Sequence, residues 1–144
     1  MDAQFQRELN DVITKVKKLG PSVVLEAKKD LTEAAGLLAA SLKGATPVSN
    51  KPHAIRGNVY TPGTSRRAMK VLPLRRAKTS AFVGPSFRAS KPPFYIKFIE
   101  RGTRHIKARR FIERTAEQSG PIAQDIAIKL LLRRIGKFEK ENFK

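Results

Sequence analysis

The stretch that decides the fold is YIKFIERGTRHIKARRFI, residues 95–112. An apolar element ends in it at Gly102, a basic loop follows, and a second apolar element begins at Phe111. Glycine permits a positive φ or a close backbone approach, and the hydroxyl of Thr103 can hydrogen-bond within a turn. We therefore expect a sharp turn after Gly102, with Phe98 and Phe111 anchored in the core on either side of it.

The element before this turn has two interpretations. Phe94, Ile96 and Phe98 alternate with polar or aromatic neighbours as in a strand, whereas Tyr95, Phe98 and Ile99 share one face of a helix. Strand and helix therefore both remain open here.

Glu100 is an acidic residue among basic ones. Its neighbours in the sequence are Lys97, Arg101 and Arg104. We expect it to form an ion pair that fixes the local geometry.

The segment after the turn, residues 111–144, is helical by its period, and Gly120-Pro121 predicts a kink or a restart within it. One apolar stripe comprises Ile128, Leu131, Leu132, Ile135 and Phe138. A second stripe beside it comprises Ile122, Ile126 and Leu130. Together they are too wide for one small core. Either both stripes are simply buried, or one packs internally while the second meets a neighbouring subunit, and the second stripe is therefore the candidate subunit interface.

Residues 1–43 carry the same helical period. Apolar side chains recur at steps of three and four up to Leu19, and again from Val23 to Leu42. Gly20-Pro21 interrupts them, which predicts either two helices or one kinked helix. Ser22 is the expected N-cap of the second part.

The middle of the chain lacks that period. Residues 44–65 are rich in Pro and Gly, which predicts an extended arm or loop that orders against a partner. Within the basic strand and loop region 66–110, residues 66–76 and 79–83 predict an antiparallel pair of strands, with Pro73 at an edge or a bulge. The expected fold is a single α+β domain over residues 1–144, with N-terminal helices, a small antiparallel sheet and a long C-terminal helix.

Charge is concentrated in the same middle region. The chain has 30 Lys and Arg against 12 Asp and Glu. Residues 51–110 hold sixteen of these basic residues but a single acidic residue, Glu100. Such a segment favours a polyanion as its neighbour. The candidate residues for a surface that faces DNA or a partner protein are Arg66, Arg67, Lys70, Arg75, Arg76 and Lys78.

Other classes of protein find little support. The chain has no cysteine, its two histidines lie far apart, and no nucleotide-binding or hydrolase motif is present. We therefore expect no enzymatic activity, no catalytic residues, no cofactor and no metal. No apolar run approaches the roughly 20 residues of a membrane span, and no signal peptide is recognisable.

Residues 79–119 carry a more specific pattern. It consists of Val83-Gly84 at a strand end, then Y-x-x-F-x-E-x-G-T, then A-R-x-F, and its residues are Val83, Gly84, Tyr95, Phe98, Glu100, Gly102, Thr103, Ala108, Arg109 and Phe111. The order and spacing resemble the tail-component family of long-tailed bacteriophages related to the lambdoid tenth gene product. Two departures are Arg110, where that family usually has Pro, and the longer segment 44–65.

The resemblance implies a tail-completion or head-to-tail joining protein of the virion neck, made in the host cytoplasm. It further implies a homo-oligomeric ring, commonly six-fold, between the head connector and the tail terminator or tail tube. Such a ring surrounds the path of the genome, so its basic segment could contact genomic DNA or acidic faces of neighbouring proteins.

Two alternatives come from charge alone. One is a free nucleic-acid-binding protein without sequence preference, although no zinc-finger, helix-turn-helix or aromatic RNA-binding pattern accompanies the bases. The other is a peripheral membrane protein that uses a basic helix around Arg133, Arg134 and Lys137, which ranks lower because the core needs the apolar face of that helix.

Overall fold

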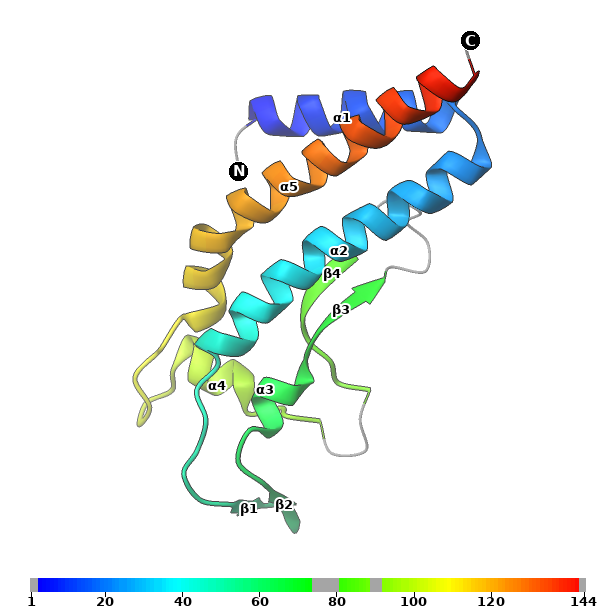
Figure 1. The fold of residues 1–144 in the computed structure, drawn as a ribbon. Helices are drawn as coiled ribbons and strands as arrows, with labels where there is room; N and C mark the ends of the chain where they lie inside the picture. The colour runs from blue at the N-terminus through cyan, green and yellow to red at the C-terminus, as the bar shows by residue number, and fades with distance from the viewer. Residues whose placement is uncertain (1–2, 74–80, 89–91, 143–144) are drawn as a thin grey trace.

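Three helices form the body of the protein, and two small hairpins accompany them (Figure 1). The computed structural model describes residues 3–73, 81–88 and 92–142. In chain order the elements are α1 (Ala3–Lys18), α2 (Pro21–Ala45), β1 (His53–Ile55), β2 (Asn58–Tyr60), α3 (Thr64–Ala68), β3 (Met69–Pro73), β4 (Ala81–Pro85), α4 (Ile96–Arg101) and α5 (Phe111–Asn142). The expected α+β class is confirmed.

The first hydrophobic core lies between α1, α2 and α5. Its buried residues are Val12, Val16, Val23, Ala27, Leu131 and Ile135. Alanines are also buried along the contact between α2 and α5, among them Ala34 and Ala127. Small side chains let two helix backbones approach closely, so the two longest helices pack against each other over much of their length (Figure 1).

The break at Gly20-Pro21 separates two helices. Gly20 adopts φ 106° as the N-cap of α2, and Pro21 occupies the first helical turn. Proline suits that position because it has no N–H to satisfy and its φ is already helical. The expectation that Ser22 caps this helix is therefore wrong, because Ser22 already lies inside it.

Helix α5 runs without interruption from Phe111 to Asn142. Pro121 lies inside the helix, so the predicted restart does not occur. The loss of one backbone N–H at Pro121 is tolerated within a helix that is packed against α1 and α2.

The second core joins α2, the β3–β4 hairpin, α4 and the start of α5. It consists of Leu42, Met69, Ile96 and Phe111, with Val83 packed against it. Strands β3 and β4 pair in antiparallel fashion, as expected, with Val71 opposite Val83. The first strand begins only at Met69, so the expectation that Arg66 and Arg67 belong to a strand is wrong.

Those two arginines lie on the short helix α3. Gly63 adopts φ 80° before this helix and accepts a hydrogen bond from the backbone N–H of Arg67 at 2.9 Å. The Thr64 hydroxyl donates to the Thr61 carbonyl at 2.7 Å. A left-handed glycine with a bonded threonine beside it is a local turn signal that the search for strand periodicity overlooks.

Residues 44–65 differ from the expected arm or loop. Strands β1 and β2 form a hairpin whose two-residue turn is Arg56-Gly57, both with positive φ. His53 and Tyr60 stack at 5.8 Å, and Tyr95 meets Tyr60 edge-on at 5.2 Å. These rings attach the hairpin to the segment that begins α4, so the chain itself supplies the surface on which this hairpin packs.

Candidate functional site: the glycine turn and the basic end

The glycine turn has the geometry that its sequence predicts. Gly102 follows α4 with φ 77°, and a Cβ atom at this position would lie 2.8 Å from the Ile106 carbonyl oxygen and 2.8 Å from the Ala108 backbone nitrogen. Real Cβ atoms do not approach so closely. Both expectations for Gly102, a positive φ and a close backbone approach, are therefore confirmed.

Thr103 closes the turn. Its hydroxyl oxygen accepts hydrogen bonds from the backbone N–H groups of His105 at 3.2 Å and Ile106 at 3.1 Å. Its own backbone N–H donates to the Ile106 carbonyl at 2.8 Å. The basic loop after Gly102 is thus folded back by one side chain, as expected.

Glu100 holds the two helices on either side of the turn together. One carboxylate oxygen accepts the backbone N–H of Ile112 and the other accepts that of Glu113, both at 3.0 Å. Within the described chain no Lys or Arg pairs with this carboxylate. The expected ion pair is therefore wrong, because the unsatisfied N–H groups at the start of α5 are the nearer donors and also favour a negative charge.

The conformation of Arg110 excludes a proline at this position. It adopts φ 46° immediately before α5. Proline is held near φ −65° and cannot take this conformation. Arg110 also donates its backbone N–H to the Glu100 carbonyl at 3.1 Å, a bond that proline would lose.

The aromatic residues of the motif occupy unequal positions. Phe111 is buried, as expected, but Phe98 is 38% exposed and is not a core anchor. Its ring lies beside Phe94, and the Lys97 ammonium lies 5.1 Å from the ring centre. Ile96 fills the core position instead, because α4 is a helix and turns that side chain inward.

The other motif residues lie close to this turn or on the neighbouring hairpin. Gly84 is buried opposite Lys70, between β4 and β3. Arg109 donates its backbone N–H to the Ile99 carbonyl at 2.9 Å, next to the bond from Arg110. Ala108 contacts Gly102 as described above.

The structure does not show the six candidate basic residues together on one surface. Arg75, Arg76 and Lys78 lie outside the described residues. Arg67 binds its own turn, donating to the Pro62 carbonyl at 3.1 Å and to the Thr61 hydroxyl at 2.9 Å. It therefore stabilises the entry into α3, which a strand prediction could not anticipate.

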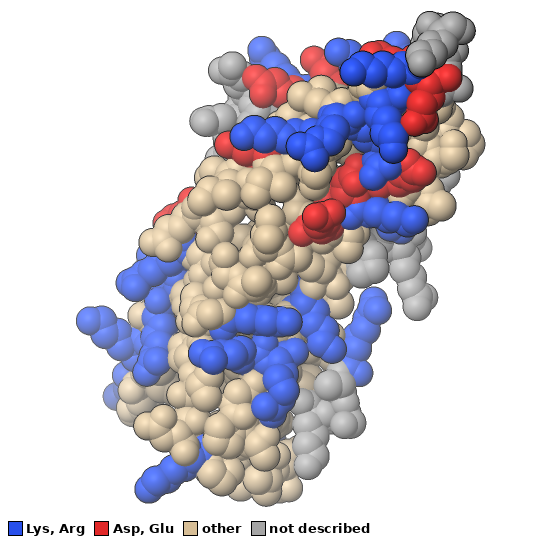
Figure 2. All heavy atoms as spheres, in the orientation of Figure 1, with Lys and Arg blue, Asp and Glu red and all other residues tan. Residues whose placement is uncertain are grey.

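Charge is nevertheless segregated along the molecule. On the face drawn in Figure 2, Lys and Arg cover the end that carries α3 and α4 without any Asp or Glu, whereas both signs gather around α1 and the first turns of α2. On this face the fold thus separates a basic end from an end of mixed charge.

Two clefts lie on either side of α3 at this basic end. The first, of about 670 Å³, is lined by Arg66, Arg109 and Arg114. The second, of about 370 Å³, is lined by Arg67, Lys70 and Arg88. Sequence reasoning did not single out Arg114 or Arg88 at all, and it placed Arg109 only in the motif. Only the fold brings these arginines together, since they come from separate segments.

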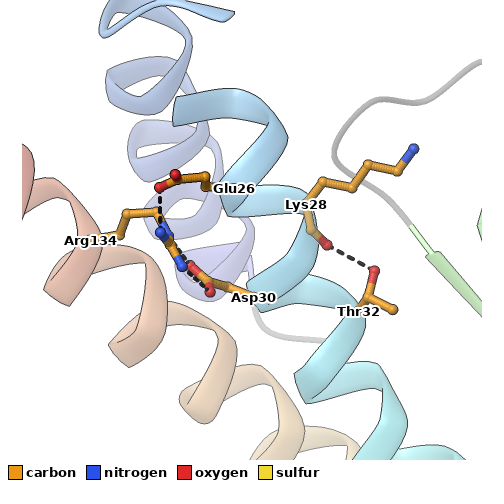
Figure 3. A network of polar contacts seen from close by, with 5 residues as sticks. All are labelled: Glu26, Lys28, Asp30, Thr32 and Arg134. Carbon is orange, nitrogen blue, oxygen red and sulfur yellow. Dashed lines mark hydrogen bonds and ion pairs between the residues drawn. The ribbon is translucent and has the colours of Figure 1, made fainter. Parts of the chain in front are cut away.

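At the opposite end, Arg134 has an internal role (Figure 3). It reaches from α5 to α2, donating to both oxygens of Asp30, one of them at 2.7 Å, and to Glu26. The hydrogen bond to Asp30 is the main cause that raises the pKa of Arg134 above its ordinary value. This pairing turns Arg134 towards α2, which weakens the membrane alternative that needed it on an outer face.

The candidate subunit stripe on α5 is only partly exposed. Ile122 is 61% exposed, and Ile126 and Leu130 are half-buried. These side chains follow one another at steps of four, so they share one flank of the helix.

The described residues include no group of three or more His, Cys, Asp or Glu that could hold a metal ion. None of the helices, over the part of the chain described, is long and apolar enough to cross a membrane. No family model, curated protein or solved structure matches the chain significantly.

Proposed function

We propose that this chain is a non-enzymatic structural protein of a bacteriophage virion, a tail-completion or head-to-tail joining component of the neck. In this role it forms a ring of identical subunits between the head connector and the tail terminator or tail tube. It is made in the host cytoplasm and acts within the assembled particle.

The observation that carries the proposal is the role of the motif in the fold. Glu100, Gly102 and Thr103 each meet a geometric requirement of one compact turn, and together they fix α4 against the first turn of α5. Residues with such linked roles specify a local structure, and the proposal rests on the resemblance of this motif to the pattern of the phage tail-component family.

The proposed ring needs a surface that the single chain leaves uncovered. Ile122 is the most exposed residue of the second stripe on α5, and Ile126 and Leu130 continue that flank. Burial of such a flank by a neighbouring subunit would remove apolar area from water. We therefore assign the subunit interface to these residues.

The test is deletion of the gene from the phage that encodes it. We expect filled heads and complete tails that are not joined, visible by negative-stain electron microscopy, and joined particles again when a plasmid supplies the protein. Normally joined, infectious particles without the protein would contradict the proposal. They would favour the free nucleic-acid-binding alternative.

A further inference from the structure

The two basic clefts differ from an ordinary solvated surface because none of the described residues that line them carries a carboxylate. The acid of residues 51–110, Glu100, has both oxygens engaged by backbone N–H groups of α5. Glu113 pairs with Arg110, which lines neither cleft, at 3.8 Å. The described part of the chain therefore supplies no counter-charge to the arginines of the clefts.

The arginines of the first cleft are placed by the backbone and keep their charged groups available. Arg109 is held through its backbone N–H to Ile99, and Arg114 through its backbone N–H to Arg110 at 3.0 Å. Neither guanidinium forms a hydrogen bond or ion pair with the described residues. Arg66 donates to the Thr46 carbonyl at 3.4 Å, which leaves most of its five donors unused.

We propose that these clefts bind the phosphate backbone of double-stranded DNA, with Arg66, Arg109 and Arg114 as the main contacts. Guanidinium groups bind phosphate oxygens in pairs of parallel hydrogen bonds, and such contacts carry no information on base sequence. Because consecutive residues of α3 line clefts on opposite sides of the helix, the surface suits a chain of phosphates better than one isolated anion.

A phosphate backbone also fits the second cleft better than an acidic protein does. Tight protein interfaces are centred on buried aromatic or apolar anchors. The described residues that line the second cleft include Thr64, Ser86, Ala68 and Pro93 beside its basic residues, and none of them is aromatic. The lining of the first cleft includes Phe111, which is already buried in the second core. That the phosphates belong to DNA, rather than to RNA, rests on the proposed function in the neck.

The experiment compares two variants with equal loss of charge. One is Arg66→Gln/Arg109→Gln/Arg114→Gln, and the control is Lys29→Gln/Lys129→Gln/Arg133→Gln, at exposed positions of α2 and α5. Binding to a 30-base-pair duplex of mixed sequence is measured by fluorescence anisotropy over a series of salt concentrations. Circular dichroism establishes that each variant is folded, and Arg109→Gln/Arg114→Gln replaces the triple variant if the loss of the Arg66 contact unfolds it.

We expect the wild-type chain and the control to bind with similar steep salt dependence. The cleft variant should lose about three units of the slope of log K against log salt, and at least about tenfold in affinity near 0.1 M salt. Equal binding by the cleft variant and the control would overturn the proposal. So would binding of a polyglutamate peptide but not of DNA, which would instead indicate an acidic protein partner.

The phosphate site and the neck function can be contradicted independently of each other. If the protein joins heads to tails but does not bind DNA, the phosphate site is wrong and the neck function stands. If the cleft variant loses DNA binding but deletion of the gene leaves joined particles, the site stands and the neck function is wrong.

Discussion

The carboxylate of Glu100 and the backbone N–H of Ile112 are joined by a hydrogen bond of 3.0 Å that ties the end of α4 to the first turn of α5. The second oxygen of the same carboxylate takes the next N–H of that helix. One side chain thus satisfies two of the N–H groups that every helix leaves unpaired at its start. This contact lets a six-residue helix and a 32-residue helix meet at a fixed angle across the nine-residue, largely basic connection of residues 102–110.

Replacing Glu100 with alanine should therefore lower the free energy of unfolding by about 1–2 kcal/mol, the usual effect of losing a helix cap. Glu100→Gln should fall between that variant and the wild type, because the amide keeps a single acceptor oxygen. Urea titration followed by circular dichroism measures both. The control Glu113→Gln, at an exposed position beside it, should change stability by less than about 0.5 kcal/mol. Equal effects at the two positions would contradict the capping role.

Gly102→Ala should destabilise the protein by about 2 kcal/mol or more, because the positive φ and the contacts at 2.8 Å both oppose a Cβ atom. Gly36 offers a matched control, since it lies inside α2 with open space around it. Gly36→Ala should stabilise the protein by about 0.5–1 kcal/mol. Thermal melts of the two variants should therefore shift in opposite directions, and a neutral Gly102→Ala would refute the close approach.

Arg110→Pro tests the conformation at the start of α5. The φ of 46° excludes proline, and the bond to the Glu100 carbonyl would be lost as well. We expect a loss of about 3 kcal/mol or more in urea titrations. Arg110→Gly should change stability by less than about 1 kcal/mol, because relief of the left-handed strain offsets the greater freedom of the unfolded chain. A stable Arg110→Pro variant would mean that α5 begins with a conformation that proline can adopt.

Arg134→Met should cost about 2–3 kcal/mol, below the usual range for buried pairs because the Arg134 side chain is 30% exposed. The loss arises mainly at Asp30, whose side chain is only 8% exposed and would keep an unpaired charge. Arg134→Lys should recover part of this stability, since a lysine cannot reproduce the paired bonds to the carboxylate. The neighbouring exposed Arg133→Met should have little effect in the same denaturation experiment. Similar effects at the two arginines would argue against the pairing.

Ile122→Glu tests the proposed subunit interface. The side chain is 61% exposed in the single chain, so the melting temperature should not change. A charge buried at a subunit contact is costly, so a plasmid carrying this variant should fail to restore joined particles to a deletion phage. Leu132→Gln, at a position that is also exposed but does not belong to the second stripe, should restore them. Joined particles with the Ile122→Glu variant would mean that the subunit interface does not include Ile122.

The sequence predicted the long elements of this fold because their apolar side chains repeat over many turns. Helices α1, α2 and α5 follow from such repeats, whereas the β3–β4 pair follows from two extended stretches joined by a short connection, and its first strand begins later than predicted. It also predicted Gly102 and Thr103, since a glycine turn depends on its own residues. Other short elements were harder: α3 has only five residues, and the β1–β2 hairpin depends on the positive φ of Arg56 and on the ring of Tyr95, the N-cap of α4.

The partners of charged residues could not be predicted, because they depend on contacts distant in the sequence. Glu100 bonds to N–H groups twelve and thirteen residues away, and Arg134 reaches Asp30 across 104 residues. The cleft of Arg66, Arg109 and Arg114 likewise needs the end of α2, α3 and the start of α5 in place. The sequence pattern indicated the basic region, but it could not show which basic residues the fold brings together.

The central claim is the place of this protein in a phage particle, and a label on the protein tests it most directly. The deletion phage is complemented with a C-terminally tagged copy, and purified particles are examined by electron microscopy with gold bound to the tag. We expect gold at the junction of head and tail. Gold at the capsid surface or the tail tip, or particles that carry no label although they are joined and infectious, would contradict the account.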